Sequence, residues 1–194
     1  MPSEDRNDPR ALSLSLDRDN ALLLVIDVQE KLARAMPAEG LARLEKNAAI
    51  LIQAARRLGL PVVASEQYVK GLGPTVPALR EALPSPPIEK LEFSCGASKS
   101  LAREIMKAGR KQVIVVGMEA HVCVFQTVRD LLRGDYAVFV PQDAIVSRTE
   151  ENRQVGLRLC EKAGATLTST ETVLFDLLGT AGTPEFKELA PLIR

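Results

Sequence analysis

The sequence lacks an excess of either charge, and it lacks any long run of apolar residues. Its 194 residues hold 25 lysines and arginines and 25 aspartates and glutamates, so the formal net charge is zero. Nucleic-acid-binding proteins usually carry a basic stripe that neutralises phosphates, so we do not expect nucleic acid as a partner. The apolar runs, such as residues 21–26, are far too short to cross a bilayer, so we expect no membrane association.

Signal-peptide features are absent as well, and cysteine is scarce. Residues 1–20 mix charged residues with two prolines and contain no apolar block of signal-peptide length. The three cysteines, Cys95, Cys123 and Cys160, are widely spaced and show no zinc-type pairing. Such cysteines are typical of free thiols in a reducing compartment. We therefore expect a cytoplasmic protein.

What the sequence does contain is a regular alternation of short apolar runs and helical patterns. With 46% apolar residues the chain can bury one full core, so we expect a single domain over residues 20–194 after an N-terminal arm of residues 1–19. The apolar runs lie at residues 22–26, 61–64, 112–116, 136–140 and 165–169. Most of them lack polar alternation, which is typical of strands covered on both faces in a parallel sheet.

Helical periodicity fills most of the intervals between these runs. Four of the helical patterns stop at a glycine before a strand, namely at Gly59, Gly109, Gly134 and Gly164. Repeated units of this kind predict an α/β fold: a doubly wound, mainly parallel six-stranded sheet with helices on both faces. In the strand order 3-2-1-4-5-6, the first and fourth strands are neighbours at the switch point, where ligands collect.

Residues 65–97 break this rhythm with several glycines and prolines. Long irregular segments in compact domains are usually functional or mobile, and a loose surface excursion fits the composition equally well. Within the segment we expect a helical turn near residues 78–82 and a short strand near residues 88–91.

Asp27 and Cys123 each follow a predicted strand, so both are expected near the switch point. Cys123 also precedes an amphipathic helix, and the positive end of the helix dipole is expected to lower the thiol pKa below its usual value of about 8.5. A thiol and a carboxylate at two strand ends favour an enzyme. The alternatives are a Cys123 that is only a small buried apolar residue and, for Lys90 in the irregular segment, a solvated side chain.

Several segments match one known family in order and spacing: residues 24–29, 90–94, 117–127 and 140–144. Through them the chain resembles the isochorismatase-like cysteine hydrolase superfamily, roughly from residue 20 to residue 180. Residues 66–76 are similar to the branch called isochorismatase domain-containing proteins, most of which have no assigned substrate.

The resemblance implies a catalytic triad of Asp27, Lys90 and Cys123. Asp27 is then the general base that takes the thiol proton, Lys90 holds the carboxylate, and Cys123 forms a thioester intermediate that water resolves. The resemblance also implies a cis peptide between Met118 and Glu119, which aims the backbone N–H groups of Glu119 and Cys123 at one point as an oxyanion hole. The expected reaction is hydrolysis of a C–N amide-type bond in a small molecule.

Two departures from better-known members narrow the chemistry. Nicotinamidases of this superfamily bind a divalent metal through an Asp-x-His pattern and a further histidine, but here residues 65–68 read Ser-Glu-Gln-Tyr and His121 is the only histidine. We therefore expect no metal and no other cofactor, and nicotinamide is not an expected substrate. True isochorismatases lack the nucleophilic cysteine, so Cys123 also argues against cleavage of a vinyl ether.

Further residues are expected to line the substrate pocket, although ordinary packing explains each of them equally well. They are Gln29, Gln67, Tyr68, Phe93, His121, Gln126 and Thr127. Because members of the family commonly assemble, we expect a homo-oligomer, a dimer or larger. Two alternatives to a hydrolase stay open: a catalytically idle binding or scaffold protein, and a thiol redox protein in which Cys95 resolves an oxidised Cys123.

Overall fold

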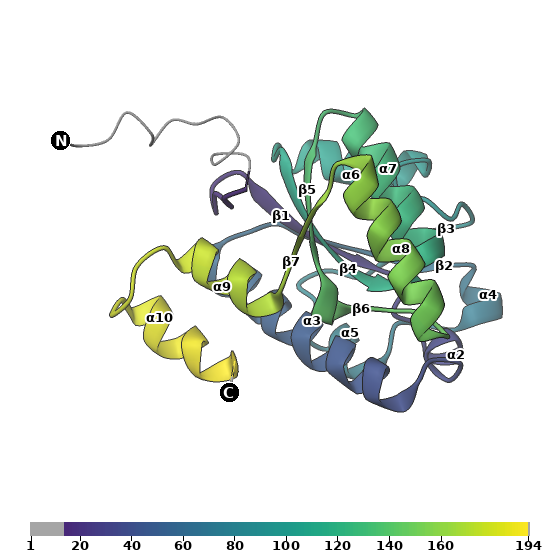
Figure 1. The fold of residues 1–194 in the computed structure, drawn as a ribbon, viewed down its shortest axis with the longest axis horizontal. Coiled ribbons are helices and arrows are strands. Elements are labelled where there is room, and N and C mark those ends of the chain that lie inside the picture. Colours follow the sequence, from purple (N-terminus) through teal and green to yellow (C-terminus); the bar gives the residue numbers. More distant parts are fainter. Residues whose placement is uncertain (1–13, 194) are drawn as a thin grey trace.

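The computed structural model describes residues 14–193. They form three layers, with a central β-sheet between two layers of helices (Figure 1). Residues 1–13 of the predicted N-terminal arm lie outside the described residues, and residues 14–19 precede the first strand. Among residues 14–193, none of the helices combines the length and the apolar character that a membrane span requires.

In the described part of the chain the sheet has seven strands, and every strand pair is parallel. The strands are β1 (Ala21–Ile26), β2 (Val62–Gln67), β3 (Ile88–Lys90), β4 (Gln112–Met118), β5 (Ala137–Pro141), β6 (Ile145–Val146) and β7 (Thr166–Thr168). The order is β3-β2-β1-β4-β5-β7, and β6 pairs with β4. This order confirms the predicted doubly wound α/β fold, in which β1 and β4 are neighbours at the switch point.

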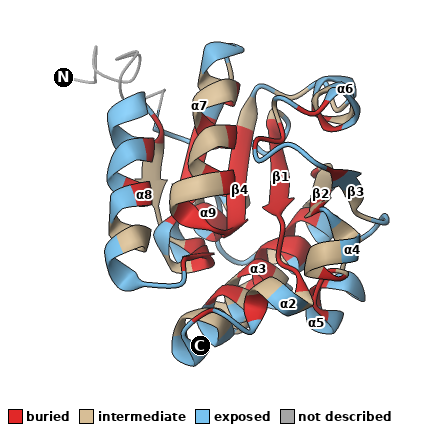
Figure 2. Ribbon diagram, turned by 90° about the vertical axis from the view of Figure 1, so that its right-hand side faces the viewer, coloured by how far each residue is buried: buried red, intermediate tan, exposed pale blue. Residues whose placement is uncertain are grey.

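Helices cover both faces of the sheet (Figure 1, Figure 2). One face carries α2 (Glu30–Ala33), α3 (Ala38–Leu58), α5 (Pro77–Arg80) and α9 (Thr170–Leu178). The opposite face carries α6 (Lys99–Lys107), α7 (Phe125–Arg133) and α8 (Glu150–Ala163). Outside the first layer, α10 (Pro184–Leu189) places Leu189 in a small apolar cluster with Leu174 of α9 and Ile50 of α3.

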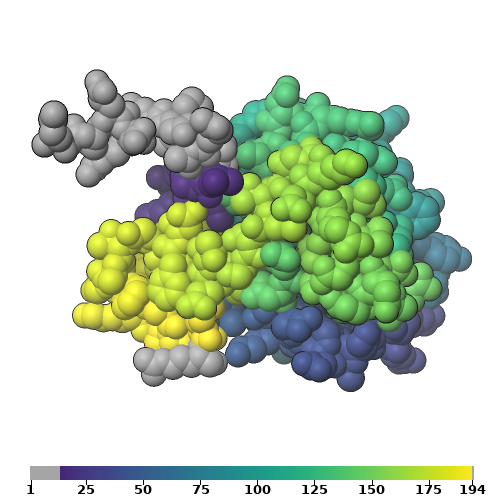
Figure 3. Space-filling model, viewed as in Figure 1, coloured from purple at the N-terminus to yellow at the C-terminus, as the bar shows by residue number. Residues whose placement is uncertain are grey.

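The start of the described chain lies beside α9, which belongs to the C-terminal part of the fold. In Figure 3 the yellow C-terminal segment adjoins the purple start of the described residues. There the backbone N–H of Leu16 donates a hydrogen bond to the carboxylate of Asp176 on α9. The segment before β1 is therefore tied to the last part of the fold.

The central strands β1 and β4 are buried along almost their whole length (Figure 2). On β1, Leu23 and Val25 face the layer of α3, whereas Leu22 and Leu24 face the layer of α7. Both faces of these strands need apolar side chains, because helices cover both. This burial explains the absence of polar alternation in the sequence.

The sheet differs from the prediction by one strand. The prediction was six strands, and the additional one is the two-residue strand β6. It forms because β5 pairs with β4 only over Gln112–Ile114, which leaves Gly117 and Met118 at the end of β4 free to pair with β6.

One of the four glycine stops also differs. Gly59, Gly109 and Gly164 have positive φ values of 77°, 67° and 109°, which favour glycine at the end of a helix. Gly134 instead has a φ of −92°, and the next residue, Asp135, takes the left-handed conformation with a φ of 58°. Aspartate tolerates that conformation better than most residues, so the stop is shifted by one position.

The irregular segment of residues 65–97 is part of the packed structure. It contains a short helix, α4 (Val69–Leu72), as well as α5 and β3, and β3 is the edge strand expected near residues 88–91. Leu79 and Cys95 within it are completely buried. The alternative of a loose surface excursion is therefore wrong.

Candidate active site

Asp27 directly follows β1 and has a left-handed backbone conformation, with a φ of 51°. This conformation is uncommon for residues other than glycine and often marks a functional site. The side chain is completely buried. Its carboxylate accepts hydrogen bonds on both oxygens, from Lys90 Nζ to Oδ2 at 2.6 Å and from Ser65 Oγ to Oδ1 at 2.7 Å.

Lys90 ends β3, and oxygen atoms surround its ammonium group. Besides Asp27, Nζ donates to the backbone carbonyls of Glu92 and Phe93, each at 3.1 Å. The three N–H donors therefore all have acceptors, and the side chain is as fully buried as that of Asp27. A solvated Lys90, the alternative that the sequence left open, is excluded.

Cys123 lies in a short π-helical turn, η2 (Ala120–Val124), between β4 and α7. Only 4% of the residue is exposed, and its thiol hydrogen-bonds to Gln67 Oε1 at a distance of 3.6 Å. Burial raises the pKa of the Cys123 thiol, and the charge of Asp27 and its hydrogen bond to the thiol raise it further, against the opposing charge of Lys90. The thiol is therefore neutral at rest.

The lowered pKa that the sequence predicts for Cys123 is wrong. The prediction relied on the helix dipole, whose effect on a nearby charge is about 0.3–1 kcal/mol at exposed sites. Burial and a neighbouring carboxylate can each change a thiol pKa more than the helix dipole does, and here both disfavour the thiolate. Neither is visible from the residues next to Cys123 in the sequence.

Two glycines allow the turn that carries Cys123 to pack against its neighbours. A β-carbon at Gly117 of β4 would lie 2.2 Å from the carbonyl oxygen of Ile26, so only glycine permits this approach to β1. A β-carbon at Gly156 of α8 would lie 2.6 Å from the carbonyl oxygen of Ala120. Backbone contacts on both sides therefore hold the turn.

Side chains from the loop before α8 hold the same turn. The Met118–Glu119 peptide bond is cis. The Glu119 carboxylate is largely buried and pairs with Arg148 Nε at 2.8 Å, and this ion pair raises the pKa of Arg148. His121 Nδ1 lies 3.1 Å from Ser147 Oγ, so the single histidine of the chain contacts the same loop.

Two of the predicted pocket residues are completely buried and make hydrogen bonds within the protein. The two N–H groups of the Gln29 amide donate to the backbone carbonyls of Gln67 and Gly73. The hydroxyl of Thr127 accepts a hydrogen bond from the backbone N–H of Cys95 at 2.9 Å. Both side chains therefore support the walls of the site.

Four of the remaining five predicted pocket residues are more accessible. Tyr68 and Phe93 are 54% and 53% exposed, and His121 and Gln126 are half-buried. Gln67 is buried, but its side chain contacts the Cys123 thiol. Gln67 ends β2 and Tyr68 follows it, Phe93 lies on the loop after β3, and the other two residues lie on the turn and helix that follow β4.

The segment that replaces the metal-binding pattern of nicotinamidases has a structural role at Glu66. Its carboxylate accepts hydrogen bonds from the Thr75 hydroxyl at 2.7 Å and from the Thr75 backbone N–H. Within residues 14–193, no group of three or more histidine, cysteine, aspartate or glutamate side chains is arranged to hold a metal ion.

Sequence reasoning missed Ser65, which contacts Asp27 directly. The sequence feature that could have indicated Ser65 is its place as a polar residue immediately after the apolar run of residues 61–64. In the sheet, Ser65 pairs with Ile26 of β1, the residue before Asp27. Ser65 is only 2% exposed, and the thiol of Cys95 lies 3.5 Å from its oxygen. Burial raises the pKa of Cys95 to about 11.

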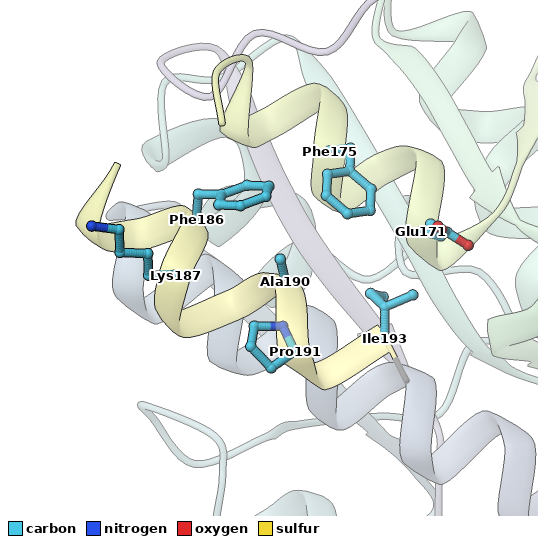
Figure 4. A pocket seen from close by; sticks show the side chains of 7 residues that line it. All are labelled: Glu171, Phe175, Phe186, Lys187, Ala190, Pro191 and Ile193. Carbon is cyan, nitrogen blue, oxygen red and sulfur yellow. The ribbon is translucent and has the colours of Figure 1, made fainter. Parts of the chain in front are cut away.

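Two cavities differ in their relation to these residues. One, of about 800 Å³, is lined by Lys90 together with Tyr68, Leu91 and Ser98. Another, of about 490 Å³, lies between α9 and α10, where the ring centroids of Phe175 and Phe186 are 6.2 Å apart (Figure 4). The second cavity contains none of the predicted site residues, so the first is the better candidate for a substrate entrance.

The fold is the one that the resemblance to isochorismatase-like hydrolases implied. The profile of the isochorismatase domain matches residues 21–172. The chain therefore belongs to the isochorismatase family and has its hydrolase fold.

Relatives match the chain over most of its length. Isochorismatase domain-containing protein 2 of Danio rerio is 37% identical over 180 residues, which are 92% of this chain and 89% of the relative. The secreted isochorismatase effector Isc1 of Phytophthora sojae is 36% identical over 182 residues, which are 90% of this chain and 85% of the relative. These matches agree with the predicted branch of the family.

Solved structures show the same fold. The MAR1 ribonuclease of Caenorhabditis elegans has a TM-score of 0.85 at 39% identity, and the match covers 92% of each chain. The YcaC gene product of Escherichia coli, an octameric hydrolase of unknown specificity, also has a TM-score of 0.85, with 93% of this chain and 89% of that chain covered. At 24% identity, the second match shows the likeness of the fold alone.

Proposed function

We propose that the protein is a cysteine hydrolase that cleaves a C–N amide-type bond in a small molecule, without a metal or an organic cofactor. The observation that carries the proposal is the buried ion pair of Asp27 and Lys90, 2.6 Å apart, whose two charges both act on the pKa of the Cys123 thiol. Apolar side chains of similar volume would stabilise a protein core at least as well as such a pair. A buried acid and ammonium group beside a thiol therefore favour a chemical role.

The raised pKa of Cys123 defines the first step. Because the thiol is neutral, it loses its proton to the Asp27 carboxylate as the sulfur attacks the carbonyl carbon of the substrate. Lys90 holds the carboxylate in place and offsets negative charge during the attack. The new C–S bond forms as an electron pair of the carbonyl moves onto oxygen, and we assign the backbone N–H groups of Glu119 and Cys123 to that oxyanion.

The second half of the reaction returns the proton. The tetrahedral intermediate collapses, the C–N bond breaks, and the amine leaves with the proton that Asp27 holds. Water then attacks the thioester while Asp27 takes one of its protons, and the C–S bond breaks. The sulfur regains that proton from Asp27, so the products are a carboxylic acid and an amine.

A substrate panel tests this proposal. Amides, ureides and hydroxamates are incubated with the native protein, with Cys123→Ala and with the control Cys160→Ala, which removes a thiol outside the site. We expect turnover in the native protein and in Cys160→Ala, and none in Cys123→Ala. Turnover that survives Cys123→Ala unchanged would exclude the covalent mechanism.

RNA belongs in the same panel, because the worm structure at 39% identity is named a ribonuclease. The balanced charge of this chain and its thiol nucleophile favour an acyl substrate, so we expect no RNA cleavage. Cleavage of RNA that requires Cys123 would replace the small-molecule substrate class with a nucleic acid.

Labelling separates the hydrolase from an idle binding protein. Iodoacetamide is expected to alkylate Cys123 faster than Cys160 at neutral pH, because Asp27 can take the proton of the Cys123 thiol, whereas among the described residues no charged group adds to the effect of burial on the pKa of Cys160. Burial raises the pKa of Cys160 to about 12. Equal and slow rates for the two thiols would favour the idle protein.

The surroundings of Cys95 support a redox role less well than the site supports hydrolysis. A resolving thiol must be accessible as a thiolate, but Cys95 is completely buried and its pKa is raised to about 11. We therefore expect no peroxide-induced disulfide between Cys95 and Cys123. A disulfide that forms in the native protein and is lost in Cys95→Ser would favour the redox protein instead.

We also propose a homo-oligomer, a dimer or larger, in which a second copy covers apolar side chains around the site. Tyr68, Leu91 and Phe93 are 54%, 72% and 53% exposed, although all three lie close to Lys90 in the sequence or line its cavity. Leu91→Arg is expected to shift the sedimentation coefficient toward that of a monomer. An unchanged coefficient would locate the interface elsewhere or exclude it.

The proposed compartment is the cytoplasm. The three cysteines are free and buried, which suits a reducing environment. The relative from Phytophthora sojae is named a secreted effector, so the location needs a direct test. Fractionation of the source cells with an antibody against the full chain is expected to find the protein in the cytoplasmic fraction.

A further inference from the structure

A line of buried polar groups joins Asp27 to the helix that carries the nucleophile. Ser65 Oγ lies 2.7 Å from Asp27 Oδ1, and Cys95 Sγ lies 3.5 Å from Ser65 Oγ. The backbone N–H of Cys95 in turn donates to Thr127 Oγ1 at 2.9 Å. Thr127 is four residues after Cys123, so it lies about one helical turn further along the same helical segment.

The direction of these hydrogen bonds is fixed by chemistry. A carboxylate only accepts, so the Ser65 hydroxyl must donate its single proton to Asp27. The oxygen of Ser65 is then free to accept, and the Cys95 thiol donates to it. Asp27 thus has one strong donor on each oxygen, Ser65 on Oδ1 and Lys90 on Oδ2, and neither oxygen can rotate away without losing a partner.

None of the steps proposed for hydrolysis uses Ser65, Cys95 or Thr127. All three are nevertheless buried, with exposed fractions of 2%, 0% and 0%. Burying a polar group costs free energy unless it is hydrogen-bonded. Apolar side chains at these positions would avoid that cost, so stability alone does not explain why the three residues are polar. The network instead connects four separate parts of the fold, β1, β2, the loop before α6, and α7, at the one place where base and nucleophile must meet.

We infer that Ser65 is a positioning residue for the general base, held in place by Cys95 and Thr127. It keeps the Asp27 carboxylate facing the Cys123 thiol, so that the proton can be transferred as the sulfur attacks. This inference rests on the proposed function, because it assigns Ser65 a role in that same reaction. It also gives Cys95 a supporting part that needs no oxidation.

Alkylation by iodoacetamide at neutral pH tests the inference without a known substrate. In Ser65→Ala, the hydrogen bond to a charged group is lost, and a bond of this kind corresponds to a rate change of roughly 10- to 100-fold. We expect alkylation of Cys123 to slow by about that factor. Alkylation of Cys160, read in the same mass spectrum, is expected to stay unchanged, whereas a general loosening of the core would accelerate it.

Paired variants separate hydrogen bonding from packing. Thr127→Ser keeps the hydroxyl, and Cys95→Ser replaces the thiol with a hydroxyl that can donate to Ser65 in its place, so both variants are expected to retain native alkylation of Cys123. Cys95→Ala and Thr127→Val remove one link each and are expected to slow it several-fold. These variants also keep the inference testable where Ser65→Ala fails to fold. Equal losses in Cys95→Ser and Cys95→Ala would overturn the inference, because packing alone would then explain them.

Turnover of an active panel compound provides the second readout. Ser65→Ala is expected to lower kcat while leaving KM within about twofold, because Ser65 supports the transfer step and not substrate binding. A folded Ser65→Ala with native kcat would overturn this inference, and an inactive Cys123→Ala in the same assay would leave the proposed hydrolase intact. Turnover in Cys123→Ala would overturn both.

Discussion

At the scale of single residues, the reactivity of Cys123 depends on two opposite charges within reach of one thiol. Asp27 raises the thiol pKa and Lys90 lowers it, so Asp27→Asn is expected to lower the pKa by removing the negative charge and leaving the positive one. The same variant loses the general base, so turnover is expected to be lost at every pH. Mass-spectrometric alkylation rates between about pH 6 and pH 11 compare the two proteins, and we expect the rate to rise with pH at a lower pH in Asp27→Asn.

The substitution is expected to make the Cys123 thiol more acidic and also to abolish turnover, and this combination makes the result informative. A more acidic Cys123 without turnover supports a catalytic Asp27. A Cys123 pKa that is unchanged or higher in Asp27→Asn would mean that Asp27 is not charged beside the thiol. Cys160→Ala is the control, because its thiol lies outside this group and its removal is expected to leave the pKa of Cys123 unchanged.

The ion pair itself makes a prediction about stability. Lys90→Met leaves the carboxylate of Asp27 buried without its cation, and breaking a buried pair in this way typically costs about 3–5 kcal/mol. We therefore expect a loss of that size in the free energy of unfolding from urea titration. Lys107→Met is the matched control, since Lys107 is 75% exposed and pairs with Glu104 only at the surface. A loss under 1 kcal/mol for Lys90→Met would contradict the buried pair.

At the scale of elements, the turn with Cys123 depends on how closely α8 approaches it. Gly156→Ala would place a β-carbon 2.5 Å from the carbonyl carbon of Ala120, and a backbone atom cannot move aside as a flexible side chain can. We expect α8 and the turn to separate, with a loss of roughly 1–3 kcal/mol in stability and a lower kcat. Urea unfolding and the panel assay measure the two effects.

A second helical glycine supplies the control. Gly40 of α3 would place its β-carbon 3.0 Å from a methyl group of Val146, which is the end of a side chain and can shift. Alanine also favours a helix over glycine by about 1 kcal/mol. Gly40→Ala is therefore expected to keep native stability within about 1 kcal/mol and to keep native activity. An equal loss in both variants would mean that the contact of Gly156 with the turn has no special role.

For the whole molecule, periodic patterns in the sequence predicted the features that are set by residues close together along the chain. Apolar runs and glycine stops were sufficient for the doubly wound α/β class, and the ends of two strands pointed to Asp27 and Cys123. Two features depend instead on residues far apart in sequence and could not be predicted. They are the pKa of Cys123, which burial and Asp27 set, and the contact between Ser65 and Cys95. The strand β6 was missed because two residues carry no periodicity.

The burial of all three thiols makes the whole protein sensitive to alkaline pH. Burial raises the pKa of Cys95 to about 11 and that of Cys160 to about 12, from an ordinary value of about 8.5 to 9, and it raises the pKa of Cys123 as well. Above about pH 9 the unfolded chain therefore loses thiol protons that the folded chain keeps, so stability falls as pH rises.

Each thiol contributes about 1.4 kcal/mol to this loss between pH 8 and pH 10, so the three together lower the free energy of unfolding by about 4 kcal/mol. Urea unfolding at both pH values, with a reducing agent present, measures the fall. Cys160→Ala removes one of the three groups and is expected to reduce the fall by about a third, whatever its effect on stability at pH 8. A fall of the same size in Cys160→Ala would mean that this thiol ionises as readily in the folded protein as in the unfolded chain.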